Sequence, residues 1–185
     1  MLKLDSDVIL SKKVLIPTGI VMGLIIIAMI FAGIFGGKKS PMEYIFQLNT
    51  RADNLSRTVQ DYNKYLSSPS LISSAAALSS NLTAITSSLA NVTQSDEYKD
   101  LDKSTSENIA TAETEIINTL NSTLENARLN ANLDRVYAQQ MATQIFDLIS
   151  IETSAKDTTE DPTLKSSLEK SISNLNALYN NFSNF

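Results

Sequence analysis

The longest apolar segment of the chain runs from Val14 to Phe35 and contains no charged side chain. As an α-helix rising about 1.5 Å per residue, it would extend roughly 33 Å, enough to cross a bilayer core of about 30 Å. A cleaved signal peptide has a shorter apolar region of about 7–15 residues and ends at a small-residue cleavage site. No such site follows Phe35. The segment therefore predicts an uncleaved transmembrane helix that anchors the chain in a lipid bilayer.

Charge is distributed unevenly along the chain. The first 39 residues carry a net charge of +3, whereas the remainder carries −8. The basic part suits anionic lipid head groups, and the acidic part would be repelled by nucleic acid, so no nucleic-acid partner is expected. We divide the chain into a short N-terminal tail (1–13), the transmembrane anchor (14–35), a linker (36–40) and an outer domain (41–185).

The orientation of the anchor is inferred from the tail and from the outer domain. Lys12 and Lys13 flank one end of the apolar segment and Lys38 and Lys39 flank the other, so the positive-inside rule discriminates little. The tail is short, as in a signal anchor, and the outer domain is poor in Lys and Arg but rich in Ser, Thr and Asn. We expect a single-pass protein of the cell membrane with a cytoplasmic N-terminus and an extracytoplasmic C-terminal domain.

Beyond the linker, apolar residues recur at alternating spacings of four and three, the heptad pattern of packed helices. Ser40 followed by Pro41 is typical of a helix start, and the segment 67–70 interrupts the first helix. The apolar positions are Leu48, Ala52, Leu55, Val59, Tyr62 and Leu66 in the first segment, and Leu71, Ala75, Leu78, Leu82, Ile85, Leu89 and Val92 in the second.

The C-terminal half continues the pattern. Ser95 and Asp161 are predicted to cap helices, a polar loop is expected from Thr153 to Asp161, and the residues 129–132 form either a turn or a polar point inside one long helix over 96–152. The apolar stripes are Tyr98, Leu101, Ile109, Ala112, Ile116, Leu120 and Leu124, then Leu133, Tyr137, Met141, Ile145, Leu148 and Glu152, then Leu164, Leu168, Ile172, Leu175, Leu178 or Tyr179, and Phe182, with Phe185 as a further candidate.

No segment alternates with the period of two that marks a half-buried strand, and Gly is absent after Gly37. The sequence thus predicts an all-α fold: an N-terminal single transmembrane helix followed by a four- to five-helix antiparallel bundle with coiled-coil-like heptads.

Residues suited to catalysis are scarce. The chain lacks His, Cys and Trp, which excludes thiolate metal sites, disulfides, a cysteine nucleophile and a histidine base. It contains no P-loop, dinucleotide fingerprint or serine elbow. Acidic residues gather at 96–102, which we interpret as charges that complement a helix start rather than as a cation site, and at 157–161 in the last loop, where they lack the spacing of a calcium-binding loop. We interpret Glu113, Glu115 and Glu125 as surface charges. We expect no enzyme, and no catalytic, cofactor-binding or metal-binding residues.

Small residues recur within the apolar segment. Gly19 and Gly23 form a G-x-x-x-G motif, and Ala28 and Ala32 repeat the same spacing. Small residues at this spacing let two transmembrane helices approach closely, although Gly and Ala are also common in transmembrane helices in general. These four residues are candidates for transmembrane helix packing, with a homo-oligomer as one outcome.

The layout of a membrane helix followed by long outer helices resembles that of LemA-type proteins. The stretch from Arg51 to Tyr62 is similar in pattern to their arginine-to-tyrosine motif but departs from it at many positions. It covers only a small part of the chain, and we infer no membership from it.

Taken together, these patterns indicate a membrane-anchored extracytoplasmic helical bundle that is non-catalytic and serves protein–protein interaction or scaffolding with an unidentified protein partner. The alternative is a ligand-sensing or regulatory accessory subunit of a membrane complex, which binds a small molecule or an ion between its helices.

Overall fold

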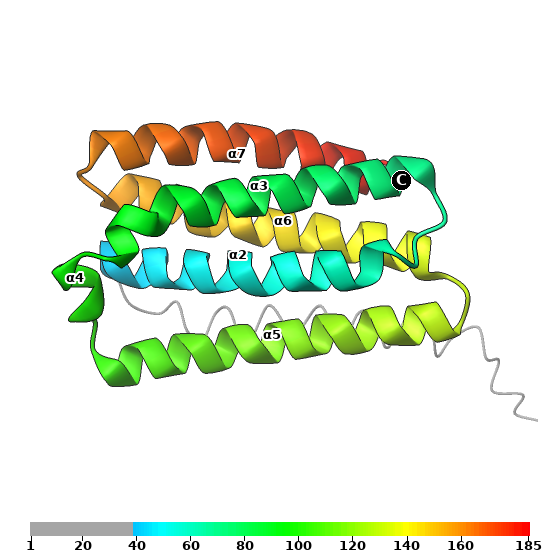
Figure 1. The fold of residues 1–185 in the computed structure, drawn as a ribbon, viewed down its shortest axis with the longest axis horizontal. Coiled ribbons are helices and arrows are strands. Elements are labelled where there is room, and N and C mark those ends of the chain that lie inside the picture. The colour runs from blue at the N-terminus through cyan, green and yellow to red at the C-terminus, as the bar shows by residue number, and fades with distance from the viewer. Residues whose placement is uncertain (1–38) are drawn as a thin grey trace, which may run out of the picture. The chain divides into compact units, whose positions relative to one another are not determined.

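The computed structural model describes residues 39–185, and this part of the chain is all-α, as predicted, with no strand (Figure 1). Its helices are α2 (Pro41–Asn63), α3 (Pro69–Thr93), the short α4 (Asp96–Lys99), α5 (Lys103–Leu129), α6 (Leu133–Thr158) and α7 (Pro162–Ser183).

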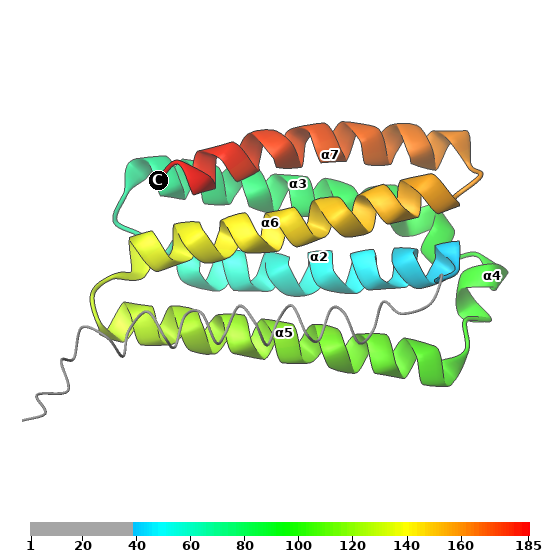
Figure 2. The ribbon, with the colours of Figure 1, turned by 180° about the vertical axis from the view of Figure 1, so that it is seen from behind.

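Four of the helices form a closed bundle, and α5 lies against its outside. Each of α2, α3, α7 and α6 packs against the next around a ring, and neighbours in the ring run antiparallel (Figures 1 and 2). Helix α5 packs on α2 and α6 and lies apart from α3 and α7 in both views. The predicted bundle is therefore confirmed in outline, with four helices around one core and a fifth helix on its flank.

Side-chain caps set the starts of the first and last long helices as predicted. The Ser40 hydroxyl accepts a hydrogen bond from the Glu43 backbone N–H at 3.3 Å, and the Glu43 carboxylate accepts one from the Ser40 N–H at 3.1 Å. This reciprocal pair is a capping box. The Asp161 carboxylate accepts from the backbone N–H groups of Thr163 and Leu164 at the start of α7.

Three predicted boundaries were wrong. Pro69 does not belong to the break but is the first residue of α3, where its missing N–H would be unpaired in any case. Ser95 caps only the four-residue α4, and Asp102 starts the long helix α5 instead.

Helix α6 continues to Thr158, so the predicted loop from Thr153 shrinks to three residues. Ala155 explains the extension, because it is fully buried and its apolar contacts hold that turn helical.

The segment 129–132 is a turn, which settles the open alternative in favour of two helices. The Asn132 N–H donates to the Ala127 carbonyl at 3.0 Å, and the Ala131 N–H donates to the Arg128 carbonyl at 3.3 Å. These two bonds form a Schellman motif, whose central residue adopts the left-handed conformation. Ala131 occupies that position with φ of 55°.

The predicted apolar stripes of the first, second, fourth and last segments face the core, buried or partly buried, except that Phe185 is 52% exposed. In the stripe of the third segment, Tyr98, Leu101 and Ala112 are partly buried and the other positions are buried. Glu113, which the prediction left off this stripe, is more buried than its neighbour Ala112. The prediction that Glu113 is a surface charge was therefore wrong.

The predicted anchor from Val14 to Phe35, together with Gly19, Gly23, Ala28 and Ala32, lies outside the described residues. Within residues 39–185, none of the helices combines the length and the hydropathy required to span a bilayer.

Candidate interaction surface and buried polar clusters

An open groove runs along the outside of the bundle between α6 and α7. We call it the α6–α7 groove; its volume is about 660 Å³. It is lined by Arg135, Ala138, Gln139, Ala142, Thr143, Phe146, Tyr179, Phe182, Ser183 and Phe185. Arg135 is the one charged residue in this lining, and the two alanines leave room between the bulky aromatic side chains.

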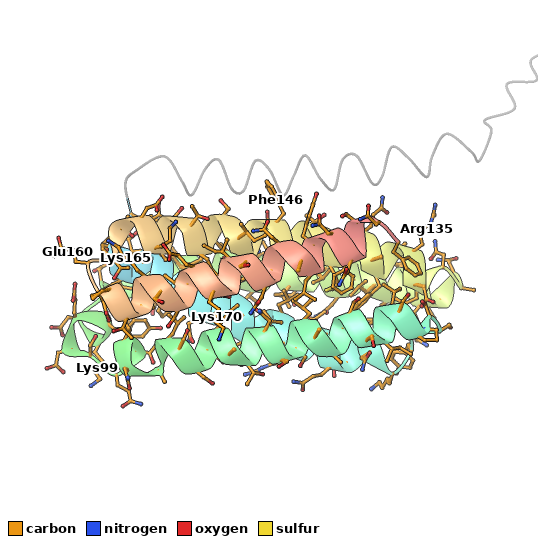
Figure 3. All side chains as sticks on the ribbon, turned by 90° about the horizontal axis from the view of Figure 1, so that it is seen from above. Lys99, Arg135, Phe146, Glu160, Lys165 and Lys170 are labelled. Atoms are coloured by element: carbon orange, nitrogen blue, oxygen red, sulfur yellow. The ribbon has the colours of Figure 1, made fainter. Side chains whose placement is uncertain are left out.

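Phe146 is a large apolar residue of the groove that stays exposed to solvent. It is 62% exposed, although α6 buries its other face in the core. Its ring lies 6.3 Å from that of Tyr179, measured between centroids, with an interplanar angle of 48°. Figure 3 shows Phe146 projecting from α6 away from the bundle. Burying such a ring stabilises a complex by roughly 1.5–3 kcal/mol.

A cluster of charged and amide side chains is buried where α2, α5 and α6 meet. Arg51 of α2 and Glu113 of α5 form a bidentate pair, with Nε and Nη2 each donating to one carboxylate oxygen. The Gln47 amide donates to the same carboxylate at 2.8 Å, and Arg51 Nη1 donates to Gln144 of α6 at 3.3 Å. Lys39 Nζ donates to Gln47 at 2.9 Å. We call this set, with Asp147, the Arg51 cluster.

Asp147 completes the cluster at its edge. Its Oδ2 lies 3.7 Å from Arg51 Nη1, an ion pair that is too long for a hydrogen bond. Burial raises the pKa of Asp147 to about 6; the Arg51 guanidinium opposes that shift and the Glu113 carboxylate adds to it. Burial lowers the pKa of Lys39, against the attraction of Glu43 and Glu113. Both pKa shifts have the same main cause, which is that burial at the three-helix junction disfavours the charged form of each side chain.

A second polar cluster lies between α3, α6 and α7. Glu152 is fully buried, and its Oε1 accepts a hydrogen bond from the Ser171 hydroxyl at 2.8 Å. Ser171 also lies 3.4 Å from Asn81 Oδ1, while Glu152 Oε2 has no hydrogen-bond partner among the described residues. Burial raises the pKa of Glu152 to about 8, and the bond from Ser171 opposes the shift. Glu152 is therefore largely neutral at pH 7 in the folded protein.

None of the three carboxylates of these clusters, Glu113, Asp147 and Glu152, lines the α6–α7 groove. Within residues 39–185, no group of three or more acidic side chains comes close enough to hold a metal ion.

The acidic helix ends behave as interpreted from the sequence. Asp102 caps α5 by accepting from the Thr105 N–H at 2.9 Å, and hydrogen bonds from Ser104 and Thr105 lower its pKa. Asp96 at the start of α4 makes an exposed ion pair with Lys99. These carboxylates stabilise helix ends and are spread over separate turns.

The Arg51 cluster was missed at the sequence level, although the spacing of both Glu113 and Arg51 signalled it. Glu113 lies four residues after Ile109 and three before Ile116, so it occupies a stripe position of α5. A charged residue at a stripe position indicates a buried partner. Arg51 lies three residues after Leu48 and four before Leu55, so it meets the same criterion on α2, and only the packing of α5 against α2 shows that Arg51 and Glu113 meet.

Comparisons with protein-family models, with curated proteins and with solved structures found no match to this chain. The resemblance to LemA-type proteins thus remains one of layout and pattern.

Proposed function

We propose that this protein is a non-catalytic interaction module, in which an N-terminal anchor holds the helical bundle at the outer side of the cell membrane and the α6–α7 groove binds another protein. The observation that carries the proposal is the exposure of Phe146 on the groove. Phe185 extends the apolar surface at the end nearer Arg135, and its side chain is also exposed.

The chemistry of the groove supports a protein ligand. Interfaces concentrate their binding energy in a few aromatic and arginine side chains, surrounded by neutral polar residues. The groove supplies this combination with Phe146, Tyr179 and Arg135, and with Gln139 and Thr143 along its length. Its open shape suits a packed helix or an extended segment better than an enclosed small molecule.

The alternative function, a ligand-sensing or regulatory subunit, has one observation in its favour. The Arg51 cluster gathers convergent polar side chains between three helices, as a ligand site between helices requires. Gln47, Arg51, Glu113 and Gln144 already hydrogen-bond to one another, however, and none of them lines the α6–α7 groove.

A topology measurement tests the membrane part of the proposal. The chain has no cysteine, so Glu160→Cys in the exposed loop between α6 and α7 introduces a unique thiol. We expect this thiol to react with a membrane-impermeant maleimide on intact cells. Lys3→Cys in the N-terminal tail is the control and should react only after lysis. Reversed labelling would overturn the orientation, and recovery of the full-length chain without detergent would overturn the anchor.

A photo-crosslinking probe tests the binding surface. With benzoylphenylalanine at position 146, we expect ultraviolet light to join the full-length chain to a defined protein in native membranes, because the ring at that position is proposed to be covered. The same probe at Leu129, which is 68% exposed in a different part of the surface, is the matched control. Equal adducts from both positions, or none from position 146, would contradict a specific surface around Phe146.

A further inference from the structure

The face of α6 that carries Phe146 has a charge pattern that is complementary to the same pattern read in the opposite direction. Arg135 lies eleven residues before Phe146, and Asp157 lies eleven residues after it. Eleven residues make about three turns of α-helix, so the three side chains lie within about 20° of one direction, at intervals of about 16 Å. Figure 3 shows Arg135 at one end of this face, Phe146 between the ends, and Glu160 near the other end.

The residues of the same stripe between these three points are uncharged. Gln139 and Thr153 lie seven residues on either side of Phe146 and fall on the same stripe. Arg135 is exposed and makes no ion pair with another described residue, and the side chain of Asp157 is 64% exposed. The stripe therefore reads as cation, neutral, aromatic, neutral, anion.

We propose that this face binds a second copy of the chain, with the two α6 helices antiparallel about a two-fold axis beside Phe146. This inference rests on the proposed function and names its partner. The axis places Arg135 of each copy against the partner's Asp157, so that one contact is made twice, as a two-fold interface requires. It also brings two Phe146–Tyr179 pairs together in an aromatic centre.

The parallel arrangement of the same faces is disfavoured by charge. It would place Arg135 against the partner's Arg135 and Asp157 against the partner's Asp157, and like charges in contact are repulsive. The antiparallel arrangement avoids both contacts while burying the same rings.

The neighbouring charges leave this pattern intact. Lys156 Nζ lies 3.7 Å from Asp157 Oδ1, and because the Asp157 side chain is 64% exposed, solvent weakens this attraction. Close to Asp157 in the sequence, Glu160 and Asp161 add two negative charges and Lys165 adds one positive charge, so this end stays anionic. At the opposite end, the Asp134 carboxylate accepts hydrogen bonds from the backbone N–H groups of residues 67 and 68, which leaves Arg135 as the cation of that end.

Thiol crosslinking of the purified full-length chain in mild detergent tests the arrangement. In the antiparallel pair, Gln139 faces the partner's Thr153, so a mixture of Gln139→Cys and Thr153→Cys chains should form a mixed dimer with a short bifunctional thiol reagent. Each variant alone should crosslink poorly, because fourteen residues of helix separate identical positions by about 21 Å. Efficient crosslinking of each variant with itself would overturn the antiparallel arrangement.

Charge reversal tests the contact that sets the direction. Arg135→Glu and Asp157→Arg should each lower the yield of mixed crosslink roughly tenfold, because every substitution acts at two symmetric contacts. The double variant should restore the yield. Arg57→Glu, in an exposed ion pair with Asp53 on α2, is the matched control and should have no effect. Failure of the double variant to recover would overturn the proposed pairing.

The outcomes separate this inference from the proposed function. If the probe at position 146 joins the chain to a different protein and no 139–153 crosslink forms, the second copy is overturned while the interaction surface stands. If neither experiment yields a protein adduct, both are overturned.

Discussion

Replacing Glu113 by alanine should lower the free energy of unfolding by about 3–5 kcal/mol. Arg51 would then stay in a site where its side chain is fully buried, without the carboxylate that accepts two of its hydrogen bonds. Asp147 would compensate in part, since it lies 3.7 Å from the guanidinium. Urea unfolding followed by circular dichroism on the full-length chain in detergent measures the loss. Hydrogen exchange should show the amides of α5 exchanging fastest.

Helix α5 provides its own control. Glu125 also pairs with an arginine, Arg128, at 2.6 Å, but both side chains are substantially exposed. Glu125→Ala should therefore cost no more than about 1 kcal/mol. Replacing both Arg51 and Glu113 by leucine should recover much of the loss of Glu113→Ala, because no charge is then left buried alone. Equal losses from Glu113→Ala and Glu125→Ala would contradict the account of the Arg51 cluster.

The second large effect is a loss of stability with rising pH, caused by Glu152. Its pKa rises from 4.5 to about 8 on folding, so the folded protein holds the proton over a range in which the unfolded chain releases it. Raising the pH from about 4.5 to about 8 therefore favours the unfolded state, and the free energy of unfolding falls. The loss of stability caused by Glu152 is absent below about pH 4.5 and complete above about pH 8.

Glu152→Gln keeps the shape of the side chain but cannot ionise. Relative to the unmodified protein, we expect its free energy of unfolding to rise by on the order of 2–4 kcal/mol between pH 5 and pH 8. Asp147, whose pKa rises to about 6, produces a slope of the same sign at lower pH, but it is present in both proteins and cancels in the difference. Unfolding curves at four pH values measure this difference.

Glu169→Gln on the exposed surface of α7 is the matched control and should leave the pH dependence unchanged. A constant difference between Glu152→Gln and the unmodified protein across the whole window would show that Glu152 ionises normally in the folded state.

The helix starts were largely predictable, because caps are local. Ser40 and Asp161 each bond to backbone N–H groups within three residues, so neighbouring residues decide the structure there. Capping preferences alone gave the wrong start for the third long helix, because Ser95 and Asp102 are both good cap residues within one acidic segment. Asp102 starts the longer helix because Ile109 and the residues after it bury their side chains against the bundle.

The candidate interaction surface was not predictable in the same way. Phe146 follows Ile145 on α6, and both are large and apolar, yet Ile145 is fully buried and Phe146 is exposed. The pattern of four and three places Ile145 on the stripe but does not say whether another helix covers its neighbour. Only the packing of the helices around α6 shows that no described helix covers the ring of Phe146.

The sequence by itself determined where most helices begin and which apolar residues of α2, α3, α6 and α7 face inward, because caps and helical periodicity act over a few residues. The tertiary structure alone decided that α5 lies outside the ring of four helices, that Arg51 and Glu113 meet, and that Glu152 Oε2 finds no hydrogen-bond partner within residues 39–185. These outcomes depend on contacts between residues far apart in the chain, where burial changes the free energy of a charge by more than any local preference does.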